Sequence, residues 1–325
     1  MPQGNRRAPQ APAPRPQIGH TALVMIPLLL TLTIGCAPTS LTPSERWPES
    51  GCVAAPPSLD DPARRARREE LRITLPDGVT LAAELLRPPG DGCWPGLLLI
   101  PPGFEAGLPL VDSDAAELLA RSGLAVLTYD PRGRGLSEGV EDHNGPVHQD
   151  DLAQLMRTLA SQPEVDPDQL VARSRSFGVA TLAGALARHA DLRPMAVMDI
   201  EGPALLPDDL EHAPARNQET LTALATDEQW WEDRSAAKHI GAYAGHYRRV
   251  QAADDHVMGA WLGHAAEMLS AAAAGEAAWV DQNGVESEAW TEEEVEALSL
   301  GGRVKADDPR ALELLIDLYA PALAP

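Results

Sequence analysis

Short strand-like runs, several of them continuously apolar, alternate with amphipathic segments along most of this sequence. The runs read WPGLLLIPPG, LAVLTYD, QLVARSRS, PMAVMDIEG and HYRRVQAADD. Segments with helical spacing separate them, such as DSDAAELLARSG, which stops at Gly123, and FGVATLAGALARHA. Strands that are apolar on both faces are typical of a parallel sheet covered by helices on both sides. The pattern therefore predicts an α/β fold.

Three other segments complete the predicted domain over residues 69–325. The stretch LRITLPDGVTLAAELLRP consists of two strand-like runs around Asp77-Gly78, which predicts a hairpin at an antiparallel edge of the sheet. Residues 203–240 are polar and helical, with Trp230 and Trp231 together, and we expect a small cap insertion there. A helix (LGHAAEMLSAAAAG), a strand (AAWVDQNG) and a terminal helix (RALELLIDLYA) follow.

The first 35 residues differ from the rest in composition. A basic, proline-rich start precedes an apolar stretch, TALVMIPLLLTLTIG, which ends at Cys36. This arrangement resembles a bacterial lipoprotein signal peptide, although Thr33 stands where that motif usually has Leu. The resemblance implies lipidation of Cys36 and a location in the cell envelope, facing the periplasm or the exterior. A cleaved secretory signal or an uncleaved anchor are the alternatives. Residues 36–68 lack a clear period and are expected to form a flexible tether.

The charge of the chain limits its partners. The formal net charge is −22, and removing residues 1–35 with their three arginines gives 23 − 48 = −25. So acidic a protein is not expected to bind nucleic acid or to adhere to anionic lipid by electrostatic attraction. We therefore expect any membrane attachment to come from the lipid on Cys36. In an oxidising compartment, Cys52 and Cys93 are expected to form a disulfide; unpaired loop cysteines are the alternative.

Two motifs carry the candidate chemistry. The stretch SRSFG, Ser174 to Gly178, lies between a strand-like run and a helical one, and YDPRGRGLSEG lies upstream of it. From about residue 70 to the end, the chain resembles the α/β-hydrolase family, although Ser174 replaces the first glycine of the usual G-x-S-x-G pattern. The resemblance implies that Ser176 is the nucleophile of a serine hydrolase. It further implies an ester or peptide substrate and no cofactor.

The same resemblance implies an oxyanion hole formed by two backbone N–H groups. Phe177 follows the nucleophile directly and supplies one of them. The second is expected from Phe104, in the loop PPGFEAG, where Pro102 replaces the histidine that is usual in the family.

A carboxylate and a histidine are needed to activate the serine. Asp255, in VQAADDHVMG, is the favoured acid, and its neighbour Asp254 is an alternative. Asp199 and Glu201, in MDIEGP, are further alternatives, because some relatives carry the acid after the preceding strand.

The histidine is missing from its usual place, since none occurs after His264. His264 is the favoured base, and His256, His143 and His148 are alternatives. If none of them serves, the chain is a non-catalytic binding protein of the same fold, or a structural envelope lipoprotein. The histidines and aspartates lack compact metal-binding spacing, and no metal site is expected.

Overall fold

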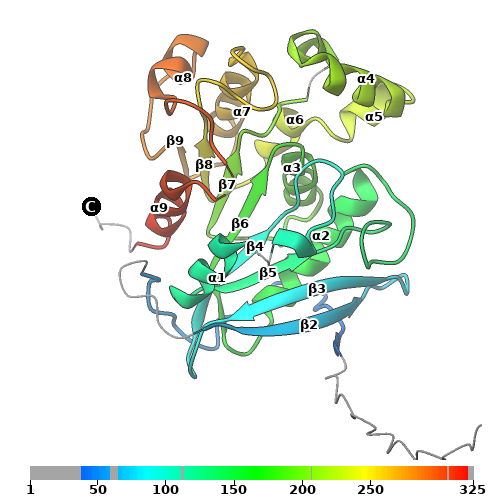
Figure 1. The fold of residues 1–325 in the computed structure, drawn as a ribbon, viewed down its shortest axis with the longest axis vertical. Coiled ribbons are helices and arrows are strands. Elements are labelled where there is room, and N and C mark those ends of the chain that lie inside the picture. The colour runs from blue at the N-terminus through cyan, green and yellow to red at the C-terminus, as the bar shows by residue number, and fades with distance from the viewer. Residues whose placement is uncertain (1–37, 59–64, 111–112, 206, 306, 321–325) are drawn as a thin grey trace, which may run out of the picture. The chain divides into compact units, whose positions relative to one another are not determined.

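The computed structural model of the protein describes residues 38–58, 65–110, 113–205, 207–305 and 307–320 (Figure 1). The expected signal peptide and the lipidation site at Cys36 lie outside these residues. In the part described, no helix combines the length and the apolar character that crossing a membrane would require.

The described residues form one nine-stranded sheet. Its strands are β1 (Thr39–Leu41), β2 (Arg67–Thr74), β3 (Thr80–Arg87), β4 (Trp94–Leu99), β5 (Ala125–Tyr129), β6 (Val165–Arg175), β7 (Ala196–Ile200), β8 (His246–Val250) and β9 (Trp279–Gln282). Their order across the sheet is β1-β2-β3-β5-β4-β6-β7-β8-β9. From β5 to β9 every neighbouring pair is parallel, whereas β2 and β3 form the predicted antiparallel hairpin.

Helices cover both faces of the sheet, as the apolar strands predicted. They are α1 (Asp114–Arg121), α2 (Pro146–Ala160), α3 (Gly178–Arg188), α4 (Ala215–Leu224), α5 (Glu228–Glu232), α6 (Ala236–Ile240), α7 (Gly263–Ala274), α8 (Glu292–Leu298) and α9 (Pro309–Asp317), with short 3₁₀ turns η1 (Leu108–Leu110) and η2 (Pro207–His212). The apolar sides of α2, α3, α6 and α7 share one core cluster with the sheet. Those of α1 and α9 belong to the cluster on its other face.

The cap insertion lies between β7 and β8, where it was predicted. It consists of η2, α4 and α5, and α4 and α5 lie beyond the carboxyl ends of the strands (Figure 1). Trp230 is buried against Phe177 and Leu205, so the cap packs next to the start of α3. The guanidinium of Arg234 lies 4.4 Å from the Trp230 ring and fixes the returning end of the insertion.

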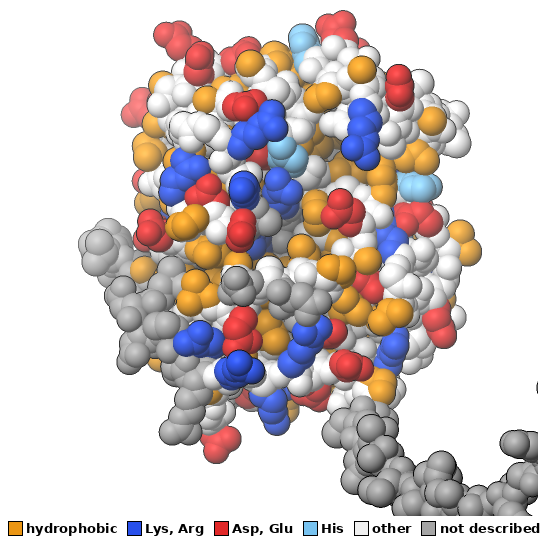
Figure 2. Space-filling model, in the orientation of Figure 1, with side chains coloured by type: hydrophobic (Ala, Val, Ile, Leu, Met, Phe, Trp, Pro, Cys, Tyr) orange, Lys and Arg blue, Asp and Glu red, His pale blue; other side chains and the backbone are white. Residues whose placement is uncertain are grey.

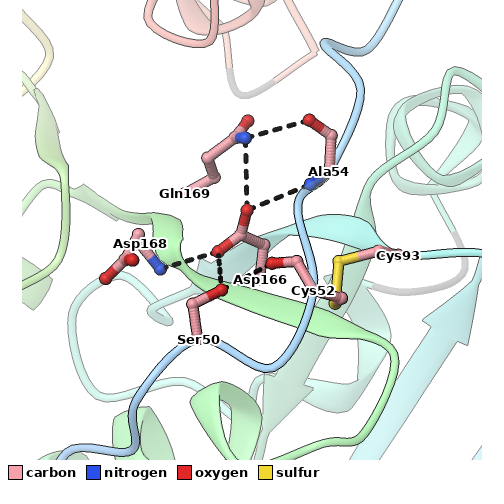
Figure 3. Close-up of a disulfide and its surroundings, with 7 residues drawn as sticks. All are labelled: Ser50, Cys52, Ala54, Cys93, Asp166, Asp168 and Gln169. Atoms are coloured by element: carbon pink, nitrogen blue, oxygen red, sulfur yellow. Dashed lines mark hydrogen bonds between the residues drawn. A yellow bond between two sulfur atoms is a disulfide. The ribbon is translucent and has the colours of Figure 1, made fainter.

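The described part of the predicted tether packs against the domain. β1 pairs in parallel with β2, and Trp47 is buried in the main core cluster. Cys52 is joined to Cys93 by the expected disulfide, with the two Cα atoms 5.9 Å apart (Figure 3). The Asp166 carboxylate accepts hydrogen bonds from Ser50 Oγ and Ala54 N, both at 3.0 Å. Backbone pairing and a crosslink thus order a segment in which we had predicted a flexible tether.

Candidate active site

Ser176 occupies a strained turn between β6 and α3, as the sequence predicted. Its φ angle is +53°, in the left-handed region that side chains other than glycine rarely adopt. The Ser176 N–H donates to Ile200 O at 2.9 Å, which ties the turn to β7. A Cβ at Gly178 would lie 2.5 Å from Pro101 O, so only glycine allows α3 to begin this close to β4. The turn therefore exposes the Ser176 hydroxyl at the carboxyl edge of the sheet.

The two predicted oxyanion donors lie side by side. The Phe104 and Phe177 rings are in edge-to-face contact, with centroids 5.2 Å apart. In the described part of the chain, neither the Phe104 nor the Phe177 N–H has a hydrogen-bond partner. Both N–H groups are therefore available to an oxyanion bound at Ser176.

Asn144 holds the two donor segments together. Its Nδ2 donates both to Gly103 O, at 3.1 Å, and to Phe177 O, at 2.9 Å. Arg134, from the YDPRGRGLSEG motif, donates to Asn144 Oδ1 at 2.8 Å and to Gly103 O at 3.2 Å. Glu141 in turn binds the Arg134 guanidinium through both carboxylate oxygens. The conspicuous sequence motif thus supports the backbone of the oxyanion hole rather than supplying a reacting group.

The alternative histidines His143 and His148 belong to this support. Asn144 N donates to His148 Nδ1 at 3.1 Å, and His148 Nε2 lies 3.0 Å from Arg132 O. Burial, together with the positive charge of Arg134, lowers the pKa of His148 to about 4. His143 packs edge-on against Phe104. Among the described residues, the His143 and His148 imidazoles contact groups other than Ser176.

Asp255 and His264, the favoured acid and base, do form a pair. His264 Nε2 lies 3.3 Å from Asp255 Oδ2, and both side chains are fully buried. Burial alone would raise the pKa of Asp255, but the adjacent His264 imidazole and a hydrogen bond from Gln251 outweigh it and hold that pKa well below its usual range. The other imidazole nitrogen, His264 Nδ1, lies 3.5 Å from the Arg249 guanidinium.

This environment differs from the one we expected for a catalytic base. Both nitrogens of His264 face buried partners, and neither of those partners is Ser176. The pair stays below the sheet edge because it completes a polar network around Arg249. That guanidinium is fully buried, binds Asp199 Oδ2 at 2.6 Å and reaches Asp255 through the side chain of Gln251. Asp199 and Asp255 thus join β7 and the loop after β8 to this network, and a catalytic role for Asp255 stays a prediction. The other alternative, Asp254, forms an exposed pair with Arg303.

A second carboxylate–imidazole pair lies at the edge itself. Glu201, the first residue after β7, is fully buried and binds His256 Nδ1 through its Oε2 atom. His256 Nε2 is buried and has no hydrogen-bond partner in the described part of the chain. This imidazole therefore retains one nitrogen that can accept a proton.

Strand register places the backbone of Glu201 beside that of the serine. Ser176 N donates to Ile200 O and Glu201 N donates to Val250 O, so the ladder continues one residue past β6 and past β7. Ser176 and Glu201 therefore end neighbouring parallel strands at the same level, about 4.8 Å apart in backbone spacing. Glu201, like Ser176, has a positive φ, of +50°. Two adjacent strained residues are typical of a functional site.

A cavity of about 350 Å³ opens beside Ser176, under the cap; we call it the cap cavity. Phe104, Phe177 and Leu221 contribute to its apolar lining. Val257 and Met258, the two residues after His256, also line it. The serine and the loop that carries the free imidazole therefore border one cavity.

One group of side chains could hold a metal ion. Ligand atoms of Glu201, Asp255 and His256 lie within 4.8 Å of one another, and this is the single such group in the described residues. Asp255 already accepts hydrogen bonds from the N–H groups of Val257 and Met258. Its oxygens thus already accept hydrogen bonds within the protein.

Comparison with known sequences identifies the family of the chain. A sequence model described as X-Pro dipeptidyl-peptidase (S15 family) matches residues 77–307, a range that contains Ser176, Glu201 and His256. Among curated proteins, the thiohydrolase aneE of Aspergillus aculeatus is 32% identical over 118 residues, which make up 36% of this chain and 36% of that protein.

Solved structures resemble this fold at low sequence identity. A puromycin-hydrolyzing peptidase of Mycobacterium tuberculosis gives a TM-score of 0.59 at 19% identity, covering 78% of this chain and 39% of that one. The acylaminoacyl peptidase of Pyrococcus horikoshii gives 0.57 at 11% identity, covering 79% and 41%. At such identities the likeness shows the fold alone, and it confirms the α/β-hydrolase fold. The chain spans well under half the length of these relatives.

Proposed function

The chain belongs to the X-Pro dipeptidyl-peptidase (S15) family, and on that basis we propose that it cleaves an ester or amide bond through Ser176. The Ser176 hydroxyl attacks the carbonyl carbon while His256 Nε2 takes its proton and Glu201 orients the imidazole. The N–H groups of Phe104 and Phe177 stabilise the oxyanion. His256 then protonates the leaving group, and water releases the acyl group from Ser176 by the same route.

The observation that carries this proposal is the Glu201–His256 pair. It supplies an imidazole with one nitrogen bound to a carboxylate and the other unpartnered, next to a serine in a strained turn. The Asp255–His264 pair resembles it in composition, and His264 Nε2 likewise has no hydrogen-bond partner in the described residues, but both of its imidazole nitrogens lie within 3.5 Å of buried charged groups. A base must have a nitrogen within reach of the proton that it takes. In the described part of the chain no histidine is hydrogen-bonded to Ser176 Oγ, and His256 is favoured because its carboxylate partner, Glu201, ends the strand next to that of Ser176.

The cap cavity limits the size and polarity of the acyl group that the protein can accept. Its volume of about 350 Å³ lies at the small end of ligand pockets, and Phe104, Phe177 and Leu221 make much of its lining apolar. A small acyl ester fits these dimensions, and so does an N-terminal dipeptide ending in proline, the group that the family's name indicates. We propose a short peptide or a small acyl ester as substrate.

The first experiment is labelling with a fluorophosphonate probe, which reacts with activated serines. We expect labelling of the wild-type protein and none of Ser176→Ala, with Ser287→Ala, a change of a half-buried serine in the loop before α8, as the matched control. Release of 4-nitroaniline from Ala-Pro-4-nitroanilide then tests the peptide substrate. A folded wild-type protein that does not label would refute the catalytic proposal and favour the non-catalytic binding protein instead.

We further propose that a lipid on Cys36 anchors the protein at the cell envelope. The Cys52–Cys93 disulfide supports this location, because disulfides persist in oxidising compartments outside the cytoplasm. Expression of the full chain in a bacterium fed an alkyne fatty acid should label the wild-type protein and leave Cys36→Ser unlabelled. Equal labelling of the two proteins would refute the lipid anchor.

A further inference from the structure

The loop of residues 101–107, which carries Phe104, is called the oxyanion loop here. A second cavity, separate from the cap cavity, also borders this loop. It has a volume of about 230 Å³, and we call it the arginine cavity. It lies between the start of α1, the end of β6 and the segment before α9, and its lining includes Ser113, Ala116, Leu119, Arg173, Arg175 and Asp307. On the face shown in Figure 2, acidic side chains predominate along the upper rim, and Lys and Arg side chains lie nearer the centre.

This cavity begins within one residue of the nucleophile. Arg175 lines the arginine cavity, whereas Ser176, the next residue, lines the cap cavity. Glu105, in the oxyanion loop, lines both of them. If the acyl group of a substrate occupies the cap cavity, the arginine cavity is the second hollow available beside Ser176, and it is available to the leaving group.

Two arginines point the same way from β6. Side chains alternate along a strand, so Arg173 and Arg175 lie on the face of Val171, which packs in the cluster of α1 and α9. Burial and the positive charge of Arg175 lower the pKa of Arg173 to about 10, although Asp307 acts in the opposite direction. Placing two guanidinium groups here is therefore unfavourable unless negative charge compensates them.

Arg175 is the group left without compensation. Its Nε is buried without a hydrogen-bond partner, and no ion pair to its guanidinium occurs in the described part of the chain. The amino end of α1 adds a partial positive charge, since Ser113 is the N-cap of that helix and also lines the cavity. These features favour an anion at this place.

We propose that the arginine cavity binds a carboxylate carried by the leaving group of the substrate, with Arg175 as its main contact. The inference rests on the proposed function. A carboxylate matches the planar fork of a guanidinium. Glu105 and Asp307 already line the cavity, so a singly charged group fits better than a phosphate. The substrate class is then a short peptide with a free carboxyl end, or an ester whose alcohol part carries a carboxylate.

Matched substrates test this inference. The ester pair is 3-carboxyphenyl butanoate and phenyl butanoate, and the peptide pair is Ala-Pro-Gly and its C-terminal amide. We expect the wild-type protein to have the higher kcat/KM for the carboxylate member of at least one pair. In Arg175→Gln the ratio of kcat/KM within that pair should fall about 10- to 100-fold, the usual effect of a charge-assisted hydrogen bond. Whichever pair responds identifies the source of the carboxylate.

The controls separate binding from damage to the fold. A ratio within one pair cancels any general loss of activity. Arg175→Lys should keep part of the preference, and Arg193→Gln, which removes an exposed charge elsewhere, should keep all of it. An unchanged ratio in Arg175→Gln would refute the inference.

If the wild-type protein hydrolyses neither pair, calorimetry decides the inference by itself, and fluorophosphonate labelling decides the proposed function separately. Binding of 3-hydroxybenzoate is measured with Ser176→Ala and with the double variant Ser176→Ala/Arg175→Gln. We expect the double variant to bind 10- to 100-fold more weakly. Equal affinities would refute a carboxylate site at Arg175.

Discussion

The side chains of two neighbouring residues in one loop, Asp255 and His256, contact different partners. The backbone of Asp255 pairs with Gly259 through two hydrogen bonds of 3.0 Å, which closes the loop after β8 into a tight turn. The Asp255 side chain points inward to His264, and that of His256 binds Glu201. His256 and His264, which are eight residues apart in the sequence, therefore differ in how accessible their imidazoles are to Ser176.

We predict that His256→Ala lowers kcat, and the rate of fluorophosphonate labelling, by about 10²- to 10⁴-fold, the usual contribution of a general base. Glu201→Gln should lower both by a smaller factor, since the imidazole stays in place but loses the carboxylate that stabilises its charged form. Rates on Ala-Pro-4-nitroanilide, or on phenyl butanoate, measure the effect.

His264→Ala is the informative comparison for this prediction. It removes one buried partner of Asp255, while Gln251 and two loop N–H groups still bind that carboxylate, so the free energy of unfolding should fall by about 1–3 kcal/mol. At a temperature where this variant remains folded, its labelling rate should stay closer to that of wild type than the rate of His256→Ala does. The reverse order of rates would identify His264 as the base.

The sequence located one candidate serine by its local pattern but left its candidate base open among four histidines. Ser176, Phe104 and Phe177 lie where local patterns place them, because a strand, a turn and a helix are determined by residues next to one another. The pairing of His256 with Glu201 joins residues from different loops. It depends on which way the turn after β8 directs two adjacent side chains, and one-dimensional spacing does not contain that information.

At the scale of elements, the N-terminal segment carries a prediction of its own. The Cys52–Cys93 disulfide spans 41 residues and fixes this segment near the bulge of β6. Removing a crosslink of that length should lower the free energy of unfolding by about 3–4 kcal/mol in the chain-entropy view. Urea unfolding of the wild-type protein and of the Cys52→Ser/Cys93→Ser variant, both under oxidising conditions, measures this difference.

Reduced wild-type protein is the control for the disulfide. It should unfold at the same urea concentration as the double variant, since both lack the crosslink. A double variant as stable as the oxidised wild type would contradict the prediction, and would mean that β1 and Trp47 hold the segment by packing alone.

The elements themselves were largely predictable from the sequence. Apolar runs such as those of β5 and β7 predicted a parallel sheet, and Asp77-Gly78 predicted the hairpin of β2 and β3. The ordered structure of residues 39–58 was not predictable in the same way. These residues are held by a parallel edge pairing, a disulfide and the Asp166 side chain, each of which comes from a distant part of the chain and leaves no period in the local sequence.

At the scale of the whole molecule, one pair of acids links the cap to the core. Asp209 lies on η2 and Glu267 lies on α7. Burial, together with the charge and hydrogen bond of Asp209, raises the pKa of Glu267 to about 7. The two carboxyl groups therefore share a proton most readily in acid solution, and they repel each other once both are ionised.

The direction of the resulting pH dependence follows from proton binding. Between the ordinary glutamate pKa and pH 7, the folded protein holds more protons at Glu267 than the unfolded chain does. The free energy of unfolding therefore decreases as the pH rises through this window, by on the order of 1 kcal/mol once solvent screening is allowed for.

Glu267→Gln removes the titration and should flatten this part of the profile. Urea unfolding at pH 5 and at pH 8 measures the slope, and Glu276→Gln, an exposed change just after the same helix, should leave it as in wild type. A slope that persists in Glu267→Gln would mean that the cap and the core are not coupled through this proton, and that the high negative charge of the whole chain causes the loss of stability instead.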